Sequence, residues 1–108
     1  APPSVSEITV HELKALLDEQ ADLYLFDVRE LAEREIAFIE GSILLDEPAV
    51  KHIDTLNRDD MLVFQCHTGI RSRSAAAYFR DQGYSRVFNL VGGIDAWSKE
   101  IDSDVPCY

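Results

Sequence analysis

The sequence has few cysteines, few basic side chains and no long apolar run, and each shortage excludes a class of protein. Two cysteines in 108 residues are too few for a disulfide framework. No apolar run approaches the roughly 18 to 20 residues of a membrane span, so no membrane-spanning segment is expected. With 46% hydrophobic residues, the chain can bury a core. We expect one domain over residues 1–108, with residues 1–6 as a flexible N-terminal lead.

The shortage of basic side chains excludes two kinds of partner. Ten Lys and Arg stand against twenty Asp and Glu, which gives a net charge of −10. The first 60 residues carry fifteen of the acidic and five of the basic side chains. Because Lys and Arg are needed to bind a phosphate backbone or an anionic bilayer, we expect no nucleic acid and no membrane as partners. Two cysteines in an acidic chain favour a reducing compartment, so the predicted localisation is cytoplasmic.

Short apolar runs alternate with stretches of helical spacing along the chain. Buried strands are predicted at residues 23–28, 43–45, 61–66 and 86–91. Helices are predicted at residues 10–20, 48–56 and 72–82, in a polar stretch that ends near residue 36, and after residue 93. Thr9 and Glu12 form a capping-box signature for the first helix, and Gly83 ends the helix at 72–82. This alternation predicts an α/β fold, with a parallel sheet covered by helices on both faces.

Cys66 ends a predicted buried strand and begins a tight link to a helix expected to start near Ser72 or Ser74. In parallel sheets, backbone amides and helix N-termini converge at the carboxyl ends of the strands. Gly69 permits a positive φ, so that successive amides can point inward as an anion-binding nest, and Arg71 can close the ring. These effects favour a thiolate nucleophile, with a pKa below the usual value of about 8.5. An inert core cysteine is the alternative, but it requires neither the glycine turn nor Arg71.

The loop from Cys66 to Arg71 resembles the catalytic loop of the rhodanese family of sulfurtransferases. The stretch Asp27–Glu30, with Glu33 and Glu35, is similar to the first signature of that family, and residues 83–97 are similar to its last. The resemblance covers nearly the whole chain. It implies a rhodanese-like α/β domain with a central parallel sheet of about five strands and helices on both faces.

The resemblance also implies a two-step transfer of a sulfane sulfur. Cys66 would take sulfur from a small anionic donor such as thiosulfate, and the resulting persulfide would pass it to cyanide or to a thiol. The substrate and persulfide would be held by the loop residues His67, Thr68, Gly69, Ile70, Arg71 and Ser72. Asp27 and Arg29 would support this loop, and a surface ion pair is the alternative for them. No cofactor is implied.

Two other functions stay open at this point. Cysteine-dependent phosphatases and arsenate reductases of related fold have a similar loop, with one more residue between its cysteine and arginine. Four residues separate Cys66 from Arg71, which makes a narrower ring that favours a single sulfur atom over a tetrahedral phosphate. Non-catalytic rhodanese-like binding modules usually lack the cysteine, whereas both Cys66 and Arg71 are present here.

The histidines and the tryptophan outside the loop are expected to be structural. His11 and His52 have no second ligand at metal spacing, so no metal site is predicted. Trp97 lies at helical spacing from Ile94 and Ile101, which predicts a stripe facing the core.

The C-terminal tail holds the second cysteine. Cys107 is expected to be a bystander, and the alternative is that it forms a disulfide by resolving a persulfide on Cys66. The tail 105–108 is also similar to the rhodanese-like domains that end the adenylyltransferases activating sulfur-carrier proteins. This similarity implies a domain cut from a longer protein, and a sulfur-relay protein is an expected partner.

Overall fold

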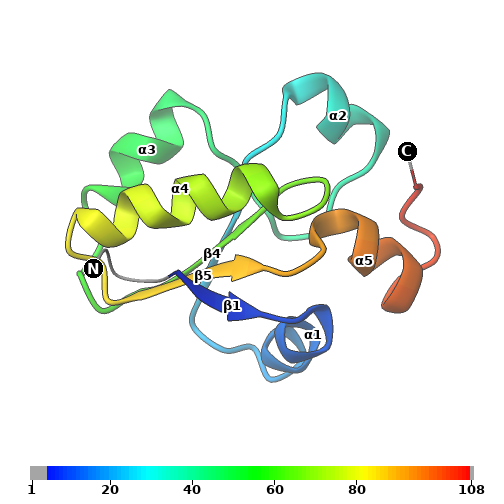
Figure 1. Cartoon of the computed structure of the whole chain (residues 1–108), viewed down its shortest axis with the longest axis horizontal. Coiled ribbons are helices and arrows are strands. Elements are labelled where there is room, and N and C mark those ends of the chain that lie inside the picture. The colour runs from blue at the N-terminus through cyan, green and yellow to red at the C-terminus, as the bar shows by residue number, and fades with distance from the viewer. Residues whose placement is uncertain (1–4, 108) are drawn as a thin grey trace.

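A computed structural model describes residues 5–107, which form a five-stranded parallel sheet with helices on both faces (Figure 1). The strands, in the spatial order β1-β5-β4-β2-β3, are β1 (Ser6–Ile8), β5 (Arg86–Leu90), β4 (Met61–Gln65), β2 (Tyr24–Asp27) and β3 (Ile43–Leu44). The helices are α1 (Val10–Asp18), α2 (Leu31–Ile36), α3 (Glu47–Ile53), α4 (Ile70–Asp81) and α5 (Gly93–Glu100). The predicted α/β fold class is confirmed.

Strand β4 lies at the centre of the sheet and is buried along its whole length. Successive side chains of a strand point to opposite faces, so β4 contributes to two separate apolar clusters. Phe64 packs in the cluster that contains Phe79 of α4, whereas Val63 packs in the cluster that contains Trp97 of α5. Trp97 is 6% exposed, which confirms its predicted place in the core. Burial on both faces holds the end of β4, and therefore the residue that follows it, in a fixed position.

Strand β1 is an element that the sequence pattern did not predict. It has three residues and pairs with β5 at the edge of the sheet, where Ser6 lies opposite Phe88. Three residues are too few for an alternation of apolar and polar side chains to stand out. The N-terminal lead expected over residues 1–6 is therefore wrong at Ser6, and residues 1–4 of it lie outside the described part of the chain.

Helix α1 begins as predicted and helix α4 does not. Thr9 and Glu12 exchange the two hydrogen bonds of a capping box, each 3.1 Å long. In α4 the N-cap is Gly69, with φ at 100°, and the helix starts at Ile70 rather than near Ser72 or Ser74. A glycine in the left-handed conformation lets the chain turn directly from the loop into the helix. Ser72 therefore stands within the first turn, where its hydroxyl group does not act as a cap.

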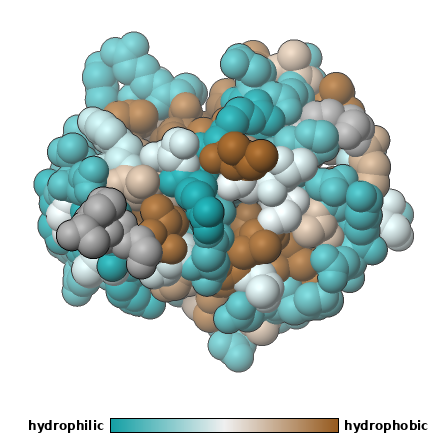
Figure 2. Space-filling view, viewed as in Figure 1, coloured by the Kyte–Doolittle hydropathy of each residue, from teal (hydrophilic) through white to brown (hydrophobic). Residues whose placement is uncertain are grey.

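Hydrophilic residues cover much of the face shown in Figure 2, and hydrophobic ones appear near its centre, where α4 begins and β5 ends. The exposed hydrophobic side chains in this region are Ile70, which is 77% exposed, and Val91, which is 46% exposed. Within residues 5–107, no helix combines the length and the apolar character needed to cross a membrane.

Candidate active site

Cys66 follows directly after β4 and lies beneath the loop that leads into α4. Only 1% of the residue is exposed. A reagent must therefore approach its sulfur through the mouth of the loop. Both Cys66 and Cys107 are free thiols in this structure.

The first turn of α5 holds the start of the loop in place. The amide of Ile94 donates to the carbonyl oxygen of Cys66 at 2.9 Å, and the amide of Asp95 donates to that of His67 at 3.0 Å. In a trans peptide the carbonyl and the following N–H point in opposite directions. Because the carbonyl groups face α5, the N–H groups of His67 and Thr68 point away from α5.

Gly93 allows this close approach. A Cβ atom at this position would lie 2.2 Å from the carbonyl oxygen of Cys66 and 2.7 Å from that of His67. These distances are far inside van der Waals contact, and Gly93 also has a positive φ of 56°. A side chain here would therefore push α5 away from the loop.

The sulfur of Cys66 is surrounded by hydrogen-bond donors. The amide of Gly69 lies 3.1 Å from Sγ, and the hydroxyl oxygen of Ser72 lies 3.3 Å from it. Burial raises the pKa of the Cys66 thiol, but the Ser72 hydroxyl and the amides of Ser72, Gly69 and Thr68 outweigh burial and lower the pKa below its ordinary value. The amide of Ser72 belongs to the first turn of α4, whose N–H groups have no partner within the helix. The environment therefore favours a thiolate.

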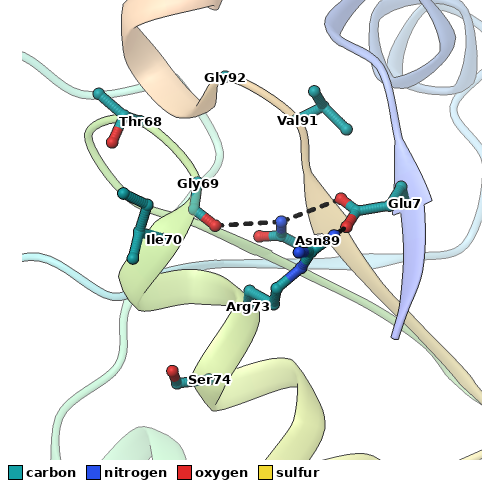
Figure 3. Close-up of a pocket in the computed structure, with 9 residues that line it drawn as sticks. All are labelled: Glu7, Thr68, Gly69, Ile70, Arg73, Ser74, Asn89, Val91 and Gly92. Atoms are coloured by element: carbon teal, nitrogen blue, oxygen red, sulfur yellow. Dashed lines mark hydrogen bonds and ion pairs between the residues drawn. The ribbon is translucent and has the colours of Figure 1, made fainter. Parts of the chain in front are cut away.

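A chain of polar side chains links this sulfur to the far edge of the sheet. Asn89 on β5 accepts a hydrogen bond from Ser72 at 2.5 Å. Its Nδ2 atom donates to Glu7 on β1 at 3.0 Å and to the carbonyl oxygen of Gly69 at 3.1 Å (Figure 3). Glu7 in turn forms a salt bridge with Arg73 on α4. Neither Asn89 nor Glu7 was among the site residues predicted from the sequence. A polar residue inside the apolar run 87–90 was a signal that could have drawn attention to Asn89.

A cavity of about 630 Å³ lies on the β1 and β5 side of the loop. Figure 3 shows Gly69 and Ile70 on one side of it and Glu7, Asn89 and Arg73 on another. The cavity is therefore lined by the loop backbone and by the polar chain just described.

Arg71 has a partner that the sequence analysis did not predict. Its guanidinium group binds both carboxylate oxygens of Glu33 on α2, at 2.7 and 2.9 Å. The Arg71 side chain is 45% exposed and that of Glu33 is 21% exposed. The pair joins the end of the loop to α2. That Arg71 closes a ring around the sulfur stays a prediction.

Asp27 and Arg29 form a buried pair at the end of β2, so the alternative of a surface ion pair is wrong. Both side chains are fully buried, and Arg29 binds both carboxylate oxygens of Asp27, at 2.8 and 2.6 Å. Arg29 also donates to the carbonyl oxygen of Ala37 at 2.7 Å, and Arg34 donates to Asp27 at 3.2 Å. The pair thus fixes α2, which carries Glu33, and the segment that follows α2.

The remaining sequence candidates lie outside this network. The sulfur of Cys107 is 3.1 Å from the hydroxyl oxygen of Ser98 on α5. The ring of His11 lies 3.3 Å from Glu100 on the surface, and the exposed His52 packs edge-on against Tyr24.

Comparison with known proteins assigns the chain to a family. The family model of the rhodanese-like domain matches residues 9–100. A protein named "Sulfurtransferase" from Allochromatium vinosum is 35% identical over 88% of this chain and 90% of its own length. The "Probable adenylyltransferase/sulfurtransferase MoeZ" of Mycobacterium tuberculosis is 36% identical over 95% of this chain, which spans only 27% of that protein. A crystal structure of a rhodanese-like domain protein from Staphylococcus aureus superposes with a TM-score of 0.75 and 28% identity, over 90% of this chain and 95% of that one.

The chain therefore belongs to the rhodanese-like domain family. The resemblance seen in the sequence is confirmed, and so is the predicted sheet of about five strands.

Proposed function

We propose that this protein is a sulfurtransferase that carries a sulfane sulfur as a persulfide on Cys66. The observation that supports this most directly is the buried Cys66 thiol, whose pKa is lowered by the hydrogen-bond donors around it. Such a thiol ionises to the nucleophilic thiolate more readily than a free cysteine does, and its burial keeps water away from the product. The family match and the relative named as a sulfurtransferase agree with sulfur transfer in general terms.

The first step forms a persulfide. The Cys66 thiolate attacks the outer sulfur of thiosulfate, a new S–S bond forms, and sulfite leaves with the electron pair of the old S–S bond. The persulfide that remains is an anion at neutral pH, and its outer sulfur stands about 2 Å beyond Sγ. The amide of Gly69 already donates to Sγ, and we expect the loop amides to stabilise the charge on the outer sulfur without rearrangement.

The second step returns the enzyme to its starting state. Cyanide or an acceptor thiolate attacks the outer sulfur, the S–S bond to Cys66 breaks, and its electron pair regenerates the thiolate. The sulfur leaves as thiocyanate or as a new persulfide. Atoms and electrons balance across the two steps, so no further oxidant or reductant is required.

Arg71 supplies positive charge at the mouth of the loop. Its salt bridge with Glu33 places the guanidinium group at the junction of α2 and α4. We expect Arg71 to attract an incoming anionic donor, although the carboxylate of Glu33 offsets part of its charge. Asp27 and Arg29 act at a distance, because they hold α2, and with it Glu33, against the end of the sheet.

A sulfur-relay protein is the partner that we propose for this domain. The relative from Mycobacterium tuberculosis is named as both an adenylyltransferase and a sulfurtransferase, and this chain matches about a quarter of its length. The exposed side chains of Ile70 and Val91 border the cavity beside the loop and give a partner an apolar surface to contact.

Intact-protein mass spectrometry after incubation with thiosulfate tests the persulfide. Wild type and Cys107→Ser should each gain one sulfur atom, and subsequent addition of cyanide should remove it as thiocyanate. Cys66→Ser, which retains Cys107, is the matched control and should gain none. Sulfur uptake by Cys66→Ser at the wild-type rate would contradict the mechanism.

A second sulfur donor tests whether a failure with thiosulfate comes from the choice of donor or from the proposed reaction itself. If thiosulfate transfers no sulfur, a low-molecular-weight persulfide should still load Cys66. If neither donor loads Cys66 while a phosphate monoester is hydrolysed, the protein is a phosphatase and the proposal fails. If the protein neither takes up sulfur on Cys66 nor hydrolyses a phosphate monoester, the alternative of a binding module is favoured.

A further inference from the structure

The hydroxyl group of Ser72 lies between two acceptors and has one proton to donate. Its oxygen is 2.5 Å from Oδ1 of Asn89 and 3.3 Å from Sγ of Cys66. All three residues are buried, with at most 3% of any of them exposed. The proton is therefore shared within this group rather than with bulk water. Asn89 therefore competes with the sulfur of Cys66 for the Ser72 proton.

The orientation of the Asn89 amide is determined by its other contacts. Its Nδ2 atom lies 3.0 Å from a carboxylate oxygen of Glu7 and 3.1 Å from the carbonyl oxygen of Gly69. Both of these groups are acceptors only, so the NH₂ group must face them. Oδ1 therefore faces Ser72, and a proton must lie between two oxygens that are 2.5 Å apart.

The thiol and thiolate forms of Cys66 differ in how many of the acceptors in this group receive a proton. In the thiol form, the S–H group donates to Ser72, and Ser72 donates to Asn89, so each proton has an acceptor. In the thiolate form, the sulfur accepts from the loop amides, and it gains a further hydrogen bond only if Ser72 turns its proton to the sulfur. If Ser72 turns to the sulfur, its oxygen and Oδ1 of Asn89 face each other with no proton between them. Asn89 thus stabilises the thiol relative to the thiolate.

We propose that Asn89 is a positioning residue that sets the balance between thiol and thiolate at Cys66 by holding the Ser72 proton. It acts through Ser72 and does not touch the reacting sulfur. This inference extends the proposed function, because it concerns the cysteine that would carry the persulfide. Such restraint is chemically useful, since a thiolate of very low pKa is a weaker nucleophile.

Charged groups around the network come from several elements. Glu7 on β1 accepts from Asn89 and pairs with Arg73 on α4, so the amide is clamped on the side away from the sulfur. The other titratable or charged side chains near the loop are His67, Arg71, Glu33 on α2 and Asp95 on α5. None of them is changed in the experiment below, so their effects on the titration of Cys66 are the same in every variant.

The test measures the thiol titration of Cys66 in the full chain. Cys107→Ser is used as the background, so that Cys66 is the one remaining cysteine. The ultraviolet absorbance of the thiolate is followed against pH for this background, for Asn89→Leu, for Ser72→Ala and for the double variant. Leu is close to Asn in shape but offers no acceptor. Asn89→Ala is a second replacement in case the leucine variant does not fold.

Asn89→Leu should lower the midpoint of the Cys66 thiol titration by about 0.5 to 1 pH unit, which is the effect of one hydrogen bond. In the Ser72→Ala background, the same replacement should leave the midpoint unchanged. A role in loop structure alone predicts the opposite sign, because a displaced Gly69 amide would stabilise the thiolate less. A raised or unchanged midpoint in Asn89→Leu, or a shift that persists without Ser72, would overturn the proposal.

This readout needs no sulfur donor, so the two proposals can fail separately. If Asn89→Leu lowers the midpoint but wild type takes up no sulfur from thiosulfate or a persulfide, the role of Asn89 stands and the proposed function fails. If wild type forms the persulfide but the midpoint does not fall, the proposed function stands and the role of Asn89 is rejected.

Discussion

Single residues determine whether the loop can form around Cys66, and Gly93 is the clearest case. Its backbone approaches the carbonyl groups of Cys66 and His67 so closely that no Cβ atom fits. The contact is what allows the first amides of α5 to bind those carbonyl groups. The hydrogen-bond donors around the sulfur therefore depend on a residue 27 positions further along the chain.

Gly93→Ala should destabilise the protein by at least about 3 kcal/mol, because it adds an overlap with the loop to the cost of a positive φ. Gly41→Ala is the matched control: Gly41 also has a positive φ, at 87°, but nothing lies within 4 Å of its Cβ position. The control should lose only about 1 to 2 kcal/mol. Urea unfolding measures both changes. Equal losses in the two variants would show that the close approach has no energetic effect.

At the scale of elements, buried polar contacts hold α2 against the end of the sheet. α2 has six residues, and none of them is buried, so apolar packing contributes little to its position. The hydrogen bonds of Arg29 to Asp27 and to the carbonyl oxygen of Ala37 hold α2 in position instead. Helix α2 then presents Glu33 to Arg71 on α4.

Arg29→Met should therefore lower the free energy of unfolding by about 3 kcal/mol or more, because it leaves the carboxylate of Asp27 buried with less compensation. Lys14→Met removes a cation from an exposed pair with Asp18, and it should cost less than about 0.5 kcal/mol. Chemical denaturation of the two variants gives the comparison. A loss in Arg29→Met as small as that in Lys14→Met would mean that the buried pair does not hold α2.

Charge acts at the scale of the whole molecule. The net charge of −10 repels an approaching anion, although arginines lie near the loop. The molecule measures 36 by 28 by 27 Å. The Debye length is about 30 Å at 0.01 M salt and about 10 Å at 0.1 M. Charges across the entire molecule are therefore felt at low salt, and only those near the loop are felt at higher salt.

Salt should accelerate the reaction of Cys66 with anions and not with neutral reagents. In the Cys107→Ser variant, raising the salt from about 0.01 to 0.1 M should speed alkylation by iodoacetate severalfold, since it screens the repulsion. Alkylation by neutral iodoacetamide is the control and should change little. Persulfide formation from thiosulfate, a dianion, should follow iodoacetate. If salt slows the iodoacetate reaction, the local arginines outweigh the net charge.

The sequence by itself determined the features that depend on neighbouring residues. Apolar runs and helical spacing predicted four of the five strands and the α/β class. A strand buried on both faces is a short run of apolar residues, which can be recognised from neighbouring residues alone. The spacing from Cys66 to Arg71 predicted the turn found at Gly69 for the same reason, and the nucleophilic role of Cys66 stays a prediction. The start of α4 was misplaced because Ser72 has the chemistry of an N-cap but is used by the sulfur and by Asn89.

Only the tertiary structure decided which distant residues complete the site. Ser72 and Asn89 are 17 positions apart, and Arg71 and Glu33 are 38 apart. Strand β1, which carries Glu7, is too short to be seen in the pattern, and the binding of α5 to the loop follows from the order β1-β5-β4 in the sheet. The periodicity of a sequence predicts which face of an element is buried. It does not predict which polar group a buried side chain will meet there, because that depends on how the elements pack.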